Sequence, residues 1–208
     1  MRVCSKRRGQ RGQPMLPVTR RHSSFLTRSL LTLGLLVGMF TVVVTPAAAS
    51  APAPNPETAQ YEVDFMQQMI DHHTMAAVMG TVCLPRAVHD ELRQTCTDII
   101  TSQGREIVTM ESWLVRWYSQ FSVPSLTSGE IHQVAQLASL RGGEFEMAFM
   151  QQMSMHHEMA IEMAQTCVAQ AYHGDLVNLC QNVITAQQDE IQQMQTWLCD
   201  WYGICKQD

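Results

Sequence analysis

Apolar side chains recur every three or four positions along most of the chain after residue 60, which is the period of an amphipathic helix and not of a strand. One apolar stripe runs from Ile99 to Trp117, and an equivalent stripe runs from Val183 to Trp201. Turn signals at His89-Asp90 and at His173-Gly174-Asp175 separate each stripe from an apolar segment before it, and an aspartate there can cap the helix that follows. The pattern predicts two helical hairpins.

The two hairpins are copies of one sequence, because residues 64–118 align with residues 148–202 without a gap at an offset of 84. The matches include Phe65 with Phe149, His72-His73 with His156-His157, and Trp117 with Trp201. A single hairpin cannot bury its apolar face alone, whereas two hairpins packed together can. The sequence therefore predicts an all-α fold, a four-helix bundle built from two repeated helical hairpins at residues 61–121 and 144–208.

Residues 122–143 are expected to connect the two hairpins. Small and polar residues from Ser122 to Ser128 indicate a loop, residues Gly129 to Leu140 a short helix, and Gly142-Gly143 a break before the second hairpin.

The first 49 residues have the features of a signal peptide. Residues 1–28 carry eight of the fourteen Lys and Arg residues and no acid, an apolar run follows from Leu30 to Val44, and small residues up to Ala49 suit a signal peptidase. The apolar run is shorter than the roughly 20 residues of a spanning helix, although an uncleaved membrane anchor is the alternative. We expect cleavage after Ala49, a Pro- and Ala-rich tether over residues 50–60, and a periplasmic or secreted protein.

Removal of this leader leaves an acidic chain. All nineteen acidic residues lie at or beyond Glu57 and six basic residues remain, so the net charge becomes 6 − 19 = −13. Nucleic acids and anionic membranes are bound largely through Lys and Arg, so the charge argues against both as partners. A cation is a better match, although acidic residues also simply keep an exported protein soluble.

Six cysteines follow the leader, and an even number in an exported chain points to disulfides. In each repeat twelve residues separate two cysteines, and each pair is centred on the predicted turn, which places its members opposite one another on antiparallel helices. The last two cysteines can close a small loop at the C-terminus. The predicted bonds are Cys83–Cys96, Cys167–Cys180 and Cys199–Cys205, with thiolate metal ligation as the alternative.

Ten of the twelve methionines after the leader fall on the first helices of the two repeats, although leucine would fill a core with better-defined rotamers. At about 100° per residue, Met66, Met69 and His73 lie within a narrow arc, and Glu62 lies beside it. The adjoining edge of this face carries further candidates, and the second repeat has the same arrangement. The candidate metal ligands are Met66, Met69, His72, His73, Met79, Met150, Met153, His156, His157 and Met163.

Thioether sulfur is a soft, neutral donor and imidazole a borderline one, and together they favour copper(I) or silver(I) over magnesium, calcium or zinc. Core packing is the ordinary role of methionine on a helix, but paired histidines flanked by methionines, twice in register, favour a metal site. Adjacent histidines point about 100° apart, so one of each pair is expected to serve a given site. We expect His89, His132 and His173 to be turn or surface residues rather than ligands.

The chain resembles the family known as domain of unknown function 305 in its run Asp64–Met69, its paired His72-His73, and its downstream Gln103, Glu106, Met110 and Trp113-Leu114. The second repeat carries the same pattern, so the resemblance covers nearly all of residues 61–202 as two tandem copies. It implies a ferritin-like four-helix arrangement. Since an exported member is a copper-binding resistance protein, it also implies copper binding outside the cytoplasm, through the paired histidines and nearby methionines.

These observations predict an extracytoplasmic copper(I)- or silver(I)-binding protein that sequesters, buffers or transfers the ion and is not an enzyme. Its expected partners are the metal ion and copper-donor or copper-acceptor proteins. One alternative is a ferritin-like metal-dependent oxidoreductase, although the sequence has no Glu-x-x-His motif of the kind that di-iron sites use. The other alternative is a methionine-rich helical module that binds partner proteins.

Overall fold

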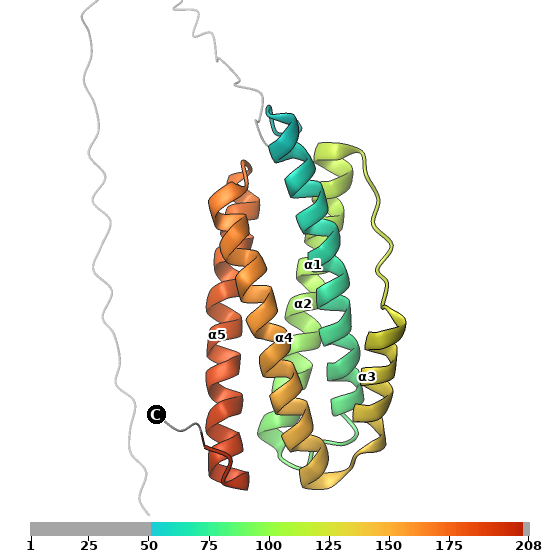
Figure 1. The fold of residues 1–208 in the computed structure, drawn as a ribbon, viewed down its shortest axis with the longest axis vertical. Coiled ribbons are helices and arrows are strands. Elements are labelled where there is room, and N and C mark those ends of the chain that lie inside the picture. Colours follow the sequence, from blue (N-terminus) through green and yellow to red (C-terminus); the bar gives the residue numbers. More distant parts are fainter. Residues whose placement is uncertain (1–50, 206–208) are drawn as a thin grey trace, which may run out of the picture. The chain divides into compact units, whose positions relative to one another are not determined.

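Five α-helices make up the part of the chain that the computed structural model describes, residues 51–205, and this part contains no strand (Figure 1). The helices are α1 (Pro56–Cys83), α2 (Asp90–Tyr118), α3 (Ser128–Ser139), α4 (Gly142–Gln170) and α5 (Gly174–Tyr202). The prediction of an all-α fold is confirmed. The signal peptide predicted for residues 1–49 lies outside the described residues.

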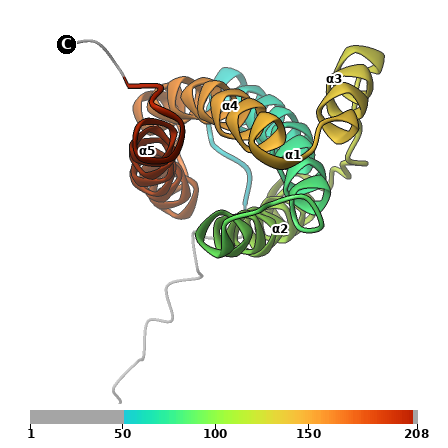
Figure 2. The ribbon, with the colours of Figure 1, turned by 90° about the horizontal axis from the view of Figure 1, so that it is seen from below.

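The four long helices form two antiparallel hairpins, α1 with α2 and α4 with α5. The hairpins contact each other through α1 and α4, and α3 lies outside the four long helices, against α1 and α4 (Figure 2). None of the helices between residues 51 and 205 is long and apolar enough to cross a membrane.

Disulfides close both hairpins near their turns. Cys83 bonds to Cys96 and Cys167 to Cys180, with the two Cα atoms 6.2 Å apart in each pair. A third disulfide, Cys199–Cys205, closes the short segment after α5. The three predicted pairings are confirmed, and these cysteines therefore supply no thiolate to a metal while they are oxidised.

Gly80 allows α1 and α2 to approach closely beside the first disulfide. A Cβ atom at this position would lie 2.9 Å from Cγ1 of Ile100 and 3.1 Å from the carbonyl oxygen of Cys96. Both distances are shorter than an ordinary van der Waals contact, so the spacing of the two helices depends on the missing side chain.

Local sequence explains where most helices begin and end. Asn55 caps α1 by accepting hydrogen bonds from the N–H groups of Glu57 and Thr58, and Pro56 occupies the first helical turn. Gly142 opens α4 with a φ of 59°, a conformation that favours glycine. The predicted caps at Asp90 and Asp175 are wrong: the cap positions are His89 and His173, and neither side chain bonds to its own helix.

Helix α3 makes the two ends of the four long helices unequal. Its Leu137 is fully buried in a core cluster that also contains Met75, Met79 and Phe145. The repeat partner of Met75 has no such cover, so Met159 is 51% exposed whereas Met75 is 4% exposed. Equivalent sequence positions therefore have different surroundings.

Candidate metal site

The paired histidines lie where the two hairpins meet, near the middle of α1 and of α4. The imidazole rings of His72 and His156 face each other, with centroids 3.7 Å apart and planes inclined by 34°. Both nitrogens of each ring are buried and have no hydrogen-bond partner among the described residues. Buried polar atoms usually have partners, so the unpartnered nitrogens leave each ring available to bind a ligand in the interior of the protein.

Both of these rings are neutral at neutral pH. Burial, assisted by the nearby His73 and His157, lowers the pKa of His72 to about 3. Burial also lowers the pKa of His156 to about 2, assisted by the positive charges that the other three histidines would carry. A neutral imidazole keeps a lone pair on one nitrogen, which is the form that binds a metal ion.

The second histidine of each pair is oriented by a glutamate across its own hairpin. Nε2 of His73 donates a hydrogen bond of 2.8 Å to Oε2 of Glu106, and Nε2 of His157 lies 2.6 Å from Oε2 of Glu190. In both rings Nδ1 is buried without a partner. A carboxylate that holds one ring nitrogen while the other stays open is the usual support for a histidine ligand.

The predicted methionine ligands separate into two buried clusters. Met66 and Met69 lie in one cluster together with residues of α2, α4 and α5, and Met79 lies in the other with Met150 and Met153. All five side chains are fully buried. Methionines of one helix therefore face different ends of the unit, so the candidates from each repeat do not form one group.

Met163 is the outlying candidate among the methionines. It is partly exposed at the edge of a pocket that Tyr61, Asp64, Phe65, Gln68 and Thr166 also line. Its repeat partner Met79 is covered because α3 packs over that half, whereas no equivalent helix covers Met163. The pattern of the single helix could not distinguish these two positions.

Two buried glutamines also have amide atoms that lack hydrogen-bond partners in the described part of the chain, and they are not among the site residues predicted from the sequence. Gln103 is 3% exposed with neither amide atom hydrogen-bonded among the described residues, and Gln187 is 3% exposed with its Oε1 unpartnered. The available signal was the recurrence of a glutamine within an apolar stripe in both repeats. Such an amide is expected to have a partner, so its orphaned atoms are an exception among buried polar groups.

Among residues 51–205 no three or more His, Cys, Asp or Glu side chains are grouped so that they could hold a metal ion. The buried side chains include imidazoles, methionine thioethers and glutamine amides.

Glu62, which the sequence placed beside the methionine face, joins the two hairpins. Its Oε1 accepts hydrogen bonds from the backbone N–H groups of Tyr172 (2.7 Å) and His173 (2.8 Å), in the turn between α4 and α5. Its Oε2 contacts Nδ1 of His173 and accepts from the hydroxyl of Tyr118. His173 lies in a turn, which is one of the two positions predicted for it, but it is only 5% exposed and stacks on Trp117.

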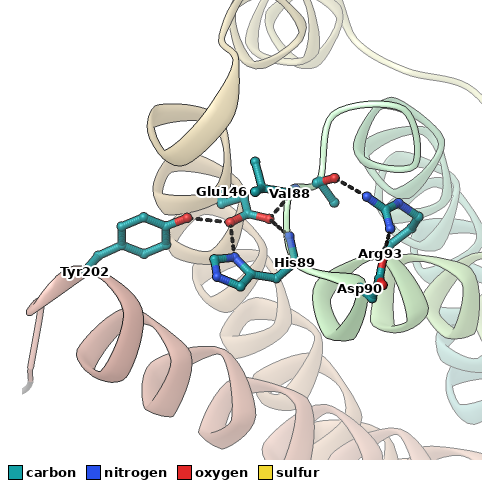
Figure 3. A network of polar contacts seen from close by, with 7 residues as sticks. Val88, His89, Asp90, Arg93, Glu146 and Tyr202 are labelled. Atoms are coloured by element: carbon teal, nitrogen blue, oxygen red, sulfur yellow. Dashed lines mark hydrogen bonds and ion pairs between the residues drawn. The ribbon is translucent and has the colours of Figure 1, made fainter.

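Glu146 makes the equivalent tie at the other end of the unit (Figure 3). Its Oε1 accepts from the N–H groups of Val88 (2.7 Å) and His89 (2.9 Å), and its Oε2 contacts Nδ1 of His89 and accepts from the hydroxyl of Tyr202. The His89 ring stacks on Trp201 with centroids 3.8 Å apart. Each first helix thus bonds to the turn of the other hairpin, which makes α1 and α4 antiparallel.

Both carboxylates are stabilised in the ionised form. Burial by itself would raise the pKa of Glu62, but hydrogen bonds from Tyr118 and His173 outweigh it, so the pKa lies below its ordinary value. For Glu146 the hydrogen bonds from Tyr202 and His89 outweigh burial in the same way. Their oxygens are already occupied by protein donors, so these glutamates serve the architecture and not the candidate site.

The fold and the site define a class of protein: a disulfide-closed pair of helical hairpins whose interface buries neutral histidines next to methionine clusters. The chain belongs to the DUF305 family, whose model, described as Domain of unknown function (DUF305), matches residues 62–198. The match is a single span across both hairpins, and the two tandem copies stay a prediction.

Solved structures of the same family are similar to this chain. CopM in the Cu(I)-bound form is 30% identical, covering 68% of this chain and 98% of that one, with a TM-score of 0.62. CopM in the Ag-bound form obtained by co-crystallization is also 30% identical over the same shares, with a TM-score of 0.61. A DUF305 fragment from Deinococcus radiodurans is 26% identical, covering 71% of this chain and 97% of that one, with a TM-score of 0.61. No curated protein matches the chain.

Proposed function

We propose that this protein binds copper(I), and silver(I) in its place, outside the cytoplasm, and sequesters, buffers or transfers the ion without catalysing a reaction. The observation that carries the proposal is the group of histidines with buried, unpartnered ring nitrogens, next to clusters of buried methionines. Soft thioethers with imidazole suit a soft monovalent cation. The similarity to CopM, which has Cu(I)-bound and Ag-bound structures, supports the choice of ion.

The rest of the proposal follows from the sequence. The basic and apolar leader and the three disulfides agree with an oxidising compartment, the periplasm or the exterior. The acidic chain after the leader suits a cation and exchange with copper-donor or copper-acceptor proteins. The ferritin-like four-helix bundle is part of the same proposal, since the two hairpins pack through α1 and α4.

Metal titration tests the proposal. Protein with intact disulfides is titrated anaerobically with copper(I) kept reduced by ascorbate, because a thiol reductant would open the disulfides and create thiolate ligands. Bound metal is counted by native mass spectrometry. We expect tight binding by the natural sequence and its loss when His72, His73, His156 and His157 are all changed to Ala.

The matched control is His132→Ala, which changes an exposed histidine of α3 and should bind as the natural sequence does. Absence of bound copper(I), or no loss in the fourfold variant, would remove the proposal. Oxygen- or peroxide-dependent turnover by the metal-loaded protein would favour the oxidoreductase alternative. A partner protein that binds equally well in the presence of a copper chelator would favour the interaction module.

A further inference from the structure

The pairing of α1 with α2 has one constant register. Cys83 bonds to Cys96; ten residues before Cys83 lies His73, and ten residues after Cys96 lies its partner Glu106. Two contacts ten residues apart on both helices fix which positions face one another along the whole seam. Met69 of α1 and Met110 of α2 each lie fourteen residues from a cysteine of this disulfide, so the same register predicts that they face each other one turn further along the seam.

The second hairpin has the same register. His157 and Glu190 each lie ten residues from the disulfide Cys167–Cys180, and Met153 and Met194 each lie fourteen residues from it. Residues four apart on a helix are neighbours on one face. A methionine therefore adjoins the histidine on the first helix, and another adjoins the glutamate on the second helix.

Burial and packing place these methionines together. Met110 is fully buried in the same cluster as Met66 and Met69, and Met194 is fully buried in the same cluster as Met150 and Met153. The unpartnered Nδ1 of His73 and the unpartnered amide of Gln103 lie on the adjoining levels of the seam. If these methionines served only to pack the core, unpartnered polar atoms beside them would be unexpected, because buried polar groups normally have partners.

We infer that each hairpin holds its own soft-metal site of three thioethers and one imidazole, in which α2 and α5 supply Met110 and Met194. The ligand sets are Met66, Met69, Met110 and His73 in the first hairpin, and Met150, Met153, Met194 and His157 in the second. The inference rests on the proposed function and adds two ligands and a stoichiometry of two ions per chain. Four neutral donors around a monovalent d¹⁰ ion leave one positive charge, which the glutamate behind the histidine offsets.

The test uses Met110→Leu and Met194→Leu, which remove the sulfur but keep an apolar side chain of similar volume. Affinity for copper(I) and silver(I) is measured by competition with a chromophoric chelator, and stoichiometry by native mass spectrometry. The natural sequence is expected to bind two ions. Each variant should keep one tight site and lose at least about tenfold in affinity at the other. Removing a residue that only supports a metal ligand already costs about tenfold or more, so removing a ligand should cost no less.

The matched control is Met75→Leu, a buried methionine of α1 that lies in the same cluster as Met194 but is absent from the ligand sets, and it should change neither quantity. A readout on the unmodified protein does not depend on the folding of any variant. Silver(I) should shift the methyl NMR signals of Met110 and Met194 and leave those of the exposed Met155 and Met159 unchanged.

The outcomes separate the two proposals. If the natural sequence takes up neither ion, the proposed function fails. If it binds metal but folded Met110→Leu and Met194→Leu keep the natural stoichiometry and affinity, the inference is wrong and the function stands. One bound ion per chain, weakened equally by both substitutions, would replace the two sites with a single shared one.

Discussion

At the scale of single residues, Glu62 and Glu146 differ from the interior histidines in the number of their hydrogen-bond partners. Each carboxylate receives hydrogen bonds from two backbone N–H groups and a tyrosine hydroxyl and contacts a histidine Nδ1, and its side chain is fully buried. A buried charge of this kind is stable only because its partners are complete. The histidine nitrogens at the hairpin interface lack such partners, which is the difference between a structural tie and a candidate ligand.

Changing Glu146→Gln should therefore lower the free energy of unfolding by about 2–3 kcal/mol. The amide keeps the shape of the side chain but loses the charge and presents an N–H₂ group to donors that need an acceptor. Urea unfolding followed by circular dichroism measures the change. Glu162→Gln, on the exposed face of the same helix, should change it by less than about 0.5 kcal/mol, and equal effects of the two substitutions would contradict this role.

At the scale of the elements, the spacing of α1 and α2 is set by a glycine next to a disulfide. A Cβ at Gly80 would meet Ile100 and the backbone of Cys96, whereas a Cβ at Gly104, in the interior of α2, would meet nothing within 4 Å. The same substitution therefore has opposite expected effects at the two positions. The close approach at Gly80 lies on the same seam as the disulfide Cys83–Cys96.

Gly80→Ala should destabilise the protein by about 1–3 kcal/mol, because the added methyl group forces the helices apart or displaces Ile100. Gly104→Ala should stabilise it by about 0.5–1 kcal/mol, since alanine loses less conformational freedom in a helix. Thermal and urea unfolding of the two variants side by side measure the difference. A stabilising Gly80→Ala would show that the close approach is not a tight one.

At the scale of the whole described unit, the two hairpins depend on each other at both ends. The first helix of each hairpin bonds to the turn of the other through Glu62 or Glu146, so the ties are reciprocal. The histidines lie between these ties, where α1 meets α4. Any condition that releases the carboxylates should loosen the interface that contains the candidate site.

Acid is such a condition, and the direction of the effect follows from the lowered pKa values. With a pKa below the ordinary 4.5 in the folded chain, Glu62 and Glu146 bind fewer protons when folded than when unfolded. Their stabilising contribution is fully present above pH 4.5 and is lost as the pH falls through the folded pKa, by at most about 1.4 kcal/mol per pH unit for each carboxylate. Urea midpoints from pH 7 to pH 3 measure this fall.

The Glu146→Gln variant provides the comparison for this pH dependence. It has lost one of the two titrating groups, so its stability should fall less steeply below pH 4.5 than that of the natural sequence. Parallel curves for the two proteins would mean that other acidic residues cause the acid sensitivity.

The sequence by itself determined the helices, the duplication and the disulfides. Helical periodicity and turn residues are local properties, and two cysteines placed symmetrically about a turn must face each other on antiparallel helices. The family follows from local motifs for the same reason. The limits of α3 were expected within one residue of Ser128 and Ser139.

Only the tertiary structure decided which candidates share an environment. A helical wheel gives directions around one axis, so it placed Glu62 beside the methionines and treated Met79 and Met163 as equivalents. Hydrogen bonds to the turn of the other hairpin draw Glu62 away from that face, and α3 and its neighbours cover Met79. Packing also brings Met110 of α2 into the buried cluster of Met69. Packing between helices, which involves residues far apart in the chain, is the physical reason that a single sequence could not supply these relations.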